Sequence, residues 1–318
     1  MLACGLFSDT MTSLPPSTTR LDPVLVSTWT GMIAIPLWSV AIGVIRSVSE
    51  IFGPLSGAAL IYTVSGLLAA SVLGLPGLRT LRKPALWYGA ALFCGYEIAL
   101  AMAIGLAHNR QQALEVGMIN YLWPGVTILF AVLTRQQRGS WWLIPAIACC
   151  LLGIGCVMQG DQPWSTASLL ENLSSNPLAY GYAFTAAVLW GVYSVVTRRF
   201  DTGKNAVPFY FLITALILWG KYALSHEPQL VFHTTGMLQV VIFAAMSATA
   251  YACWNRGVVS GNISLLATAS YFTPVLSAFL TCLWLGIRPA HEFWLGVFLV
   301  TAGSLISWVS TRSRSSLV

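Results

Sequence analysis

The sequence predicts an all-α polytopic membrane protein, with ten transmembrane helices arranged as two inverted five-helix repeats. Three observations lead to this prediction. Only 8% of the 318 residues are charged, whereas 57% are hydrophobic. Long stretches of the chain contain no charged residue, and one short segment of the first half recurs in the second half.

The scarcity of charge excludes a soluble protein. Soluble globular domains carry about 25% charged residues, roughly three times the share in this chain. A chain this apolar is expected to have the lipid bilayer as its solvent. The net charge of +6 is then a property of the loops between helices, and we expect no nucleic acid partner.

The apolar stretches indicate where the chain crosses the bilayer. A spanning helix needs about 20 apolar residues, and a charge at its centre costs roughly 2.5–3.5 kcal/mol. Barrel strands need only about 9–11 residues of alternating pattern, so these longer, uniformly apolar stretches predict helices. With turn residues as boundaries, the sequence predicts ten spans, at residues 24–45, 55–73, 84–106, 112–133, 141–159, 178–197, 207–224, 235–256, 262–285 and 291–310.

The basic residues predict the orientation of these helices, because cytoplasmic loops carry an excess of Lys and Arg. If the N-terminus is cytoplasmic, only four of the 16 basic residues fall outside, namely Arg46, Arg110, Lys221 and Arg288. Both termini are therefore expected in the cytoplasm. The expected organisation is a tail at 1–22, a first repeat at 23–160, an external loop at 161–177, a second repeat at 178–310 and a tail at 311–318.

The internal repeat is visible in two places. Residues 37–46 read LWSVAIGVIR and residues 189–198 read LWGVYSVVTR, with five identical positions. Farther along, NYLWP at 120–124 corresponds to SYFTP at 270–274. These matches align helix 1 with helix 6 and helix 4 with helix 9. The unit has an odd number of helices, so the second unit enters the membrane inverted, which is typical of secondary transporters.

With these features the chain resembles the drug/metabolite transporter superfamily, in its EamA-like branch of ten-helix exporters. The resemblance covers residues 24–310 and rests on the topology, the repeated Leu-Trp and the mid-helix Pro of helices 4 and 9. NYLWP together with CGYE at 94–97 is more closely similar to YddG-type aromatic amino acid exporters. The resemblance implies a bacterial inner-membrane protein whose two halves surround a central cavity, lined by helices 1, 3, 4, 6, 8 and 9.

Pro124 and Pro274 lie near the centres of their predicted helices. Each removes one N–H and disturbs the carbonyl four residues earlier, that of Asn120 or Ser270. These carbonyls are candidate ligands for an ammonium group, and the two prolines are candidate hinges. The alternative is a packing kink that neighbouring helices stabilise.

Glu97 is the one acid near the centre of a predicted span. Ionisable residues inside a membrane are costly and usually face a cavity. Glu97 is therefore a candidate partner for a substrate ammonium or a proton-coupling site, and the alternative is a neutral carboxyl that joins two helices. Glu115, at the outer end of helix 4, is expected to form an interfacial pair with Arg110.

Most Trp and Tyr residues are expected at the membrane interfaces, but several lie on helices that the resemblance assigns to the cavity wall. Asn120 and Trp123 are three residues apart and can share a helix face. Stacking on flat rings contributes about 0.5–1.5 kcal/mol per pair and suits an aromatic substrate. With Glu97 and Asn120, the candidate substrate-binding residues are Trp38, Tyr96, Tyr121, Trp123, Trp190, Tyr193 and Tyr271.

These features favour a secondary transporter that exports aromatic and other amino acids by alternating access, as a uniporter or with weak proton coupling. The alternatives are an exporter of another small metabolite or drug, such as a purine or an amphipathic cation, and a channel. The sequence contains no nucleotide-binding loop, nucleophile elbow or metal-ligand motif. We therefore expect a monomeric protein that is not an enzyme and uses no metal or cofactor.

Overall fold

The computed structural model describes residues 22–136, 140–159, 165–199 and 206–311, and in these ranges the chain forms helices without strands. The prediction of an all-helical chain is confirmed. The predicted tails at 1–22 and 311–318 lie almost entirely outside the described residues.

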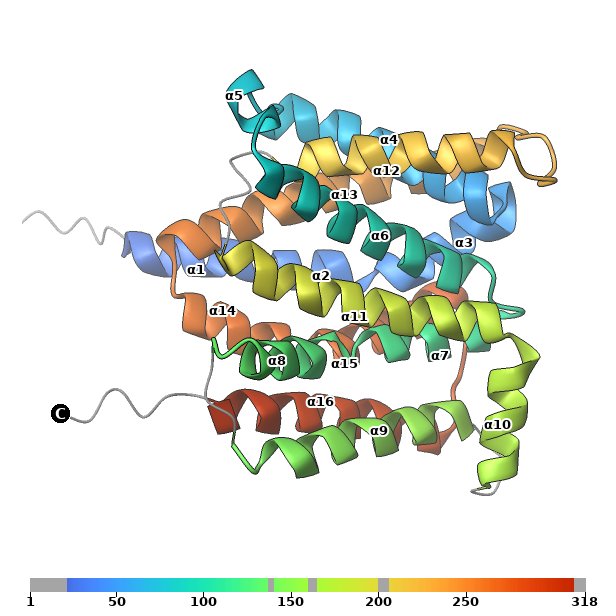
Figure 1. Ribbon diagram of the computed structural model, residues 1–318. Coiled ribbons are helices and arrows are strands. Elements are labelled where there is room, and N and C mark those ends of the chain that lie inside the picture. The colour runs from blue at the N-terminus through green and yellow to red at the C-terminus, as the bar shows by residue number, and fades with distance from the viewer. Residues whose placement is uncertain (1–21, 137–139, 160–164, 200–205, 312–318) are drawn as a thin grey trace, which may run out of the picture.

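The membrane-length segments alternate in direction along the chain, and the described ends at Asp22 and Thr311 lie at the same end of the bundle (Figure 1). The helices are α1 (Pro23–Met32), α2 (Ala34–Ser39), α3 (Ala41–Phe52), α4 (Pro54–Leu73), α5 (Leu78–Leu81), α6 (Pro84–Gly105), α7 (Arg110–Asn120), α8 (Trp123–Leu133), α9 (Leu143–Gln159), α10 (Thr166–Ser175), α11 (Pro177–Arg199), α12 (Ala206–Ala223), α13 (Thr234–Ser260), α14 (Ile263–Ser270), α15 (Thr273–Leu285) and α16 (His291–Thr311).

Each predicted span coincides with a helical segment. Eight of these segments are long and apolar enough to cross a membrane, and the apolar helices α9 and α15 are shorter. The first segment continues to Phe52, beyond the predicted end at residue 45. It can do so because Arg46 and Glu50 lie one turn apart and pair at 2.9 Å, so the two charges satisfy each other along the helix.

Part of the predicted external loop at 161–177 is helical. Helix α10 lies across the end of the bundle, next to the ends of α9 and α7 (Figure 1). Its first turn is capped by the Ser165 hydroxyl, which accepts a hydrogen bond from the N–H of Ser168 at 3.5 Å. The prediction missed this helix because ten residues are too few to show a clear periodic pattern.

Two of the predicted spans are interrupted at equivalent places. Helix α7 ends at Asn120 and α8 begins at Trp123, while α14 ends at Ser270 and α15 begins at Thr273. Each new helix has its proline in the first turn, where the missing N–H costs no helical hydrogen bond. The predicted disturbance at Pro124 and Pro274 is thus a break in the helix.

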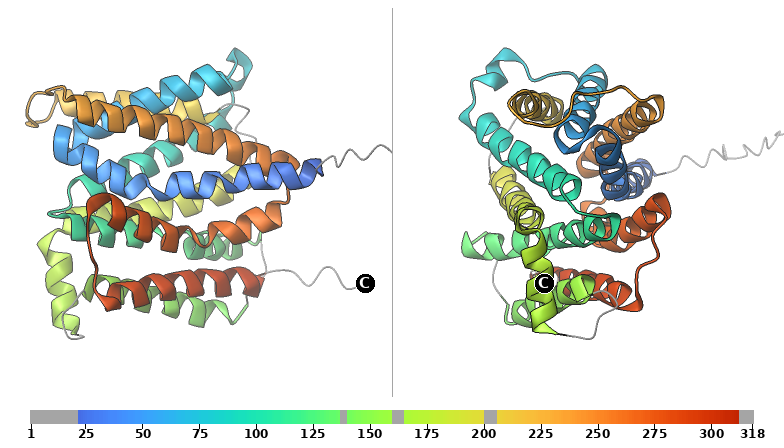
Figure 2. Two further views of the ribbon diagram at one scale, coloured as in Figure 1. Left: turned by 180° about the vertical axis from the view of Figure 1, so that it is seen from behind. Right: turned by 90° about the vertical axis from the view of Figure 1, so that its right-hand side faces the viewer.

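Helices α9 and α16 approach each other at two glycines. A Cβ on Gly153 would lie 2.8 Å from the carbonyl oxygen of Gly296, and a Cβ on Gly296 would lie 2.5 Å from that of Gly153. The two helices run side by side along one edge of the bundle, opposite α4, α12 and α13 (Figures 1 and 2). Glycine permits this contact because any larger residue would separate the helices.

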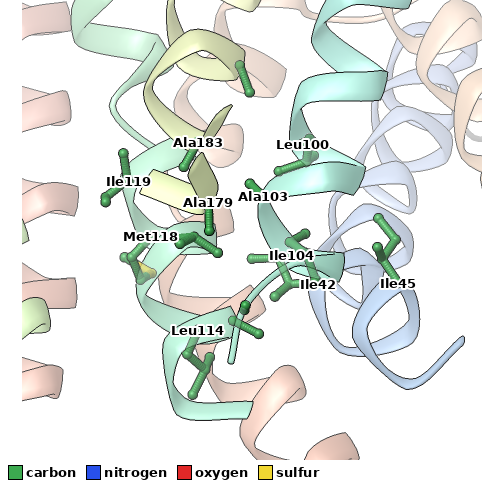
Figure 3. Packing of buried hydrophobic residues seen from close by; sticks show 14 of the residues in the cluster. Ile42, Ile45, Leu100, Ala103, Ile104, Leu114, Met118, Ile119, Ala179 and Ala183 are labelled. Carbon is green, nitrogen blue, oxygen red and sulfur yellow. The ribbon is translucent and has the colours of Figure 1, made fainter. Parts of the chain in front are cut away.

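A hydrophobic cluster lies between α3, α6, α7 and α11 (Figure 3). Isoleucines of α3 and α6 pack there with Leu114 and Met118 of α7 and with Ala179 and Ala183 of α11. Helix α7 is buried at nine of its 11 residues, whereas α8, beyond the break, is buried at three of 11. Packing is therefore tighter on the α7 side of the break.

Candidate functional site

Trp190 of α11 lies at the centre of a group of aromatic side chains in the middle of the bundle. Its ring centroid is 4.5 Å from that of Tyr96 on α6, 5.3 Å from that of Tyr193 and 6.3 Å from that of Trp123 on α8. Four of the predicted site residues are therefore neighbours, although they come from three helices. We call these four residues the aromatic cluster.

Two local features bring these rings together. The break at Tyr121 and Leu122 makes Trp123 the first residue of α8. Gly191, next to Trp190, lets α11 approach α8, because a Cβ on it would lie 2.7 Å from Cγ1 of Val126. The sequence NYLWP and the dipeptide Trp-Gly at 190–191 thus determine the meeting of α8 and α11.

A second group of rings joins the aromatic cluster through Phe93 of α6. The Phe93 centroid lies 6.2 Å from that of Trp190 and 6.4 Å from that of Tyr251 on α13. Tyr251 lies 5.1 Å from Trp38, and Trp38 lies 5.4 Å from Trp254. Phe93, Tyr251 and Trp254 were not predicted. Their spacing could have indicated them. Tyr251 and Trp254 are three residues apart and share one helix face, as do Phe93 and Tyr96.

The carboxylate of Glu97 is buried and contacts helix α4. The Tyr62 hydroxyl donates a hydrogen bond of 2.8 Å to Oε2 of Glu97 and lies 3.2 Å from the Glu97 carbonyl oxygen. Tyr62 packs against Phe211 of α12, with ring centroids 5.8 Å apart. Glu97 is therefore held at the junction of α6 with α4, beside the aromatic cluster.

Asn120 and Tyr121 occupy the break between α7 and α8, and both are buried. The Asn120 amide interacts with the Tyr96 hydroxyl. The Asn120 Oδ1 atom is buried and has no hydrogen-bond partner within the described part of the chain. It is a free acceptor next to the aromatic cluster.

Tyr271, the counterpart of Tyr121 in the second repeat, has a different neighbour. Its ring lies 6.0 Å from that of Trp308 on α16, and the neighbouring Pro274 is buried at the start of α15. The described ring contacts place Tyr271 with α16. They place five other predicted aromatics with α6, α8, α11 and α13, namely Trp38, Tyr96, Trp123, Trp190 and Tyr193.

The predicted pair between Glu115 and Arg110 is wrong. Glu115 is buried and accepts hydrogen bonds from the Tyr180 hydroxyl at 2.6 Å and from Nδ2 of Asn172 at 3.1 Å. Arg110 pairs with Glu50 at 2.7 Å. The two side chains are five residues apart on α7 and so point in different directions, which is the reason for the error.

The side chains gathered here are of two kinds. Aromatic faces supply stacking surface, while the Asn120 amide and the Glu97 carboxylate supply polar contacts that suit an ammonium group.

Comparisons with known proteins agree with this geometry. Residues 177–309 match the EamA-like transporter family. The chain is 41% identical over 286 residues to the protein named aromatic amino acid exporter YddG of Escherichia coli strain K12, covering 90% of this chain and 98% of that protein. It is 41% identical over 288 residues to the protein of the same name from Salmonella typhimurium strain 14028s, covering 91% and 98%.

A more distant relative and a solved structure extend this similarity. The YddG protein of Ancylobacter novellus is 28% identical over 294 residues, covering 90% of this chain and 98% of that protein. A solved crystal structure has the same fold, with a TM-score of 0.64, 23% identity and coverage of 92% of this chain and 99% of that one.

Proposed function

The chain belongs to the EamA-like transporters of the drug/metabolite superfamily, among the YddG-type exporters, and on this basis we propose that it exports aromatic and other amino acids. The chain is a transporter and not an enzyme. The observation that carries the substrate assignment is the 41% identity over nearly the full length of two exporters named for aromatic amino acids. The aromatic cluster is the feature of this chain that suits such a substrate.

We propose that ten helices cross the membrane as two inverted repeats, with residues 23–160 and 178–310 as the units and 161–177 as the connection. The packing of equivalent helices supports this arrangement. Helix α9 packs on α16 and α4 on α12, which pairs equivalent helices of the two repeats with each other. Helix α1 packs on α13 as α11 packs on α6, and these two pairs are also equivalent. A two-fold relation between the repeats requires this pattern.

The proposed substrate site consists of the aromatic cluster with Trp38, Asn120, Tyr121, Glu97 and Tyr271. Rings stack on the substrate side chain, and the polar groups meet the charged amino and carboxyl groups. The carbonyl of Asn120 adds an acceptor, because Pro124 has no N–H to donate to it. Glu97, which Tyr62 holds through Oε2, contributes negative charge beside the substrate ammonium.

We propose that the protein works by alternating access, with Pro124 and Pro274 as hinges. The unequal burial of α7 and α8 supports a state that is closed at one end. Three contacts join the proposed repeats at that same end: Arg110 donates to the Leu285 carbonyl at 2.9 Å, Tyr180 donates to Glu115 at 2.6 Å, and Glu227 accepts from Leu55 and Ser56 of α4. Opening this end requires these contacts to separate.

The proposed location is the bacterial inner membrane, with both termini in the cytoplasm. The excess of basic residues on the cytoplasmic side of the predicted topology supports this orientation. With this orientation, we propose that the closed end is external and that this state faces inward. A monomer is proposed, because one chain supplies both repeats and the helices of the site.

Transport in reconstituted vesicles tests the proposal. Vesicles loaded with unlabelled phenylalanine should accumulate labelled phenylalanine by exchange, with saturable kinetics, and empty vesicles should not. Competition by tryptophan and tyrosine but not by adenine or a quaternary ammonium compound supports the amino acid assignment. The opposite order of competition would favour the metabolite or drug exporter, and flux that does not saturate would favour a channel.

A further inference from the structure

Among the buried polar atoms that have no hydrogen-bond partner in the described part of the chain, two belong to the proposed substrate site, and they are of opposite kind. The Nε1 atom of Trp38 is a donor, and the Oδ1 atom of Asn120 is an acceptor. A buried polar group left without a partner costs about 1–3 kcal/mol. Such atoms at a proposed transport site indicate a ligand that supplies the missing hydrogen-bond partners.

The register of α3 against α7 places these two atoms at the same level. Arg110 contacts Glu50 at 2.7 Å, and a Cβ on Gly117 would lie 2.5 Å from Cδ1 of Ile42. The helices are therefore antiparallel. One turn farther in this register leads from Ile42 back to Trp38 on one helix, and from Gly117 past Asn120 on the other. Trp38 and Asn120 therefore lie at about the same level of the membrane.

Both residues lie at interruptions of their helices. Trp38 lies in α2, three residues before α3 begins at Ala41, and Asn120 is the last residue of α7. The Asn120 carbonyl is a further acceptor at this point of the chain, since Pro124 cannot donate to it.

We propose that Trp38 and Asn120 form a clamp for the zwitterionic head group of an α-amino acid, an inference that rests on the proposed function. The Trp38 indole N–H donates to the substrate carboxylate, and Asn120 Oδ1 accepts from the substrate ammonium. The aromatic cluster on α6, α8 and α11 then receives the side chain. In this role Trp38 binds the substrate carboxylate through its indole N–H, whereas the sequence predicted only stacking of its ring on the substrate side chain. The substrate class is the free amino acid, and compounds that lack either charged group are discriminated against.

Three probes with the same aromatic ring test the clamp: phenylalanine, 2-phenylethylamine, which has no carboxylate, and 3-phenylpropionate, which has no ammonium. Dissociation constants are measured by calorimetry on the purified full chain in detergent. The wild type should prefer phenylalanine to each of the other two by roughly ten- to hundredfold, the worth of one hydrogen bond to a charged group.

The variants separate the two halves of the clamp. Trp38→Phe should lose the preference over 2-phenylethylamine and keep the preference over 3-phenylpropionate. Asn120→Leu should show the reverse loss, and Asn120→Asp, which keeps the acceptor, should retain both preferences. The matched control is Trp29→Phe, because Trp29 on α1 is 61% exposed, and it should behave as the wild type does.

The outcomes distinguish this inference from the proposed function. If Trp38→Phe and Asn120→Leu both retain the wild-type preferences, the clamp is overturned while the proposed function stands. If the wild type binds none of the three probes, the proposed function fails and the clamp fails with it. Thermal melting of each variant shows whether it is folded, and Asn120→Asp decides the Asn120 assignment if Asn120→Leu does not fold.

Discussion

The Glu227 carboxylate accepts two hydrogen bonds from Ser56, one from its backbone N–H at 2.9 Å and one from its hydroxyl at 2.6 Å. Its second oxygen accepts from the N–H of Leu55 at 2.9 Å. A residue between α12 and α13 thus caps the first turn of α4. Gly53 makes room for the carboxylate, because its φ of +102° and missing Cβ leave the space that Glu227 occupies.

Glu227→Ala should loosen the first turn of α4. The N–H groups of Leu55 and Ser56 lose their acceptor, and loss of a helix cap costs about 0.5–2 kcal/mol. Hydrogen exchange measured by mass spectrometry should therefore be roughly two- to thirtyfold faster in the peptide that contains these amides. Glu171→Ala on the exposed side of α10 is the control, and equal exchange in both variants would contradict the capping role.

Trp190→Ala should weaken substrate binding more than any lipid-facing Trp substitution. The Trp190 ring contacts Tyr96, Tyr193, Trp123 and Phe93, and its removal takes away the common stacking surface. At about 0.5–1.5 kcal/mol per aromatic pair, the KM for phenylalanine exchange should rise roughly tenfold. Trp29→Ala should leave it unchanged. An unaltered KM in Trp190→Ala would remove the aromatic cluster from the proposed site.

Glu97→Gln should raise the KM of exchange several-fold with little change in the maximal rate. Glutamine still accepts the hydrogen bond from Tyr62, so the junction of α6 and α4 persists, but the negative charge near the substrate ammonium is lost. Kinetics of labelled phenylalanine exchange measure both quantities.

A pH gradient across the vesicle membrane tests coupling at the same residue. If Glu97 does not carry a proton, the gradient should alter wild-type and Glu97→Gln exchange to the same small extent. Stimulation by the gradient that is present in the wild type and absent in Glu97→Gln would assign proton coupling to this residue.

Gly153→Val should destabilise the protein. The valine side chain meets the Gly296 carbonyl and Val300 of α16, and overpacking of a close helix contact typically costs about 1–3 kcal/mol. The midpoint of thermal unfolding in detergent should fall by several degrees. Gly181→Ala is the matched control, because a Cβ on Gly181 of α11 meets nothing within 4 Å. An equal midpoint for Gly153→Val and the control would contradict the close contact.

Sequence reasoning located the helices well because the apolar stretches are long and the breaks carry their own signal. Prolines indicated the interruptions at residues 120–123 and 270–273. The excess of basic residues in alternate loops indicated the orientation of each predicted helix. These features depend on local composition and on the cost of burying charge in lipid, both of which can be evaluated one segment at a time.

The side-chain partners could not be predicted in the same way. Glu97 contacts Tyr62, and Glu115 contacts Tyr180, a residue 65 positions away along the chain. Glu227 lies in a loop and meets α4, which precedes it by 171 residues. Such pairs depend on the rotation of each helix about its axis, and apolar stretches without a polar face leave that rotation undetermined.

The reciprocal approach of α9 and α16 predicts that the peptide link between the two proposed repeats is dispensable for holding them together. Gly153 and Gly296 each lie against the other's carbonyl, in the manner of an isologous contact between two subunits. Two fragments, 1–160 and 161–318, should therefore assemble into one transporter when they are expressed together. The contact between α9 and α16, the last helix of each fragment, would join them.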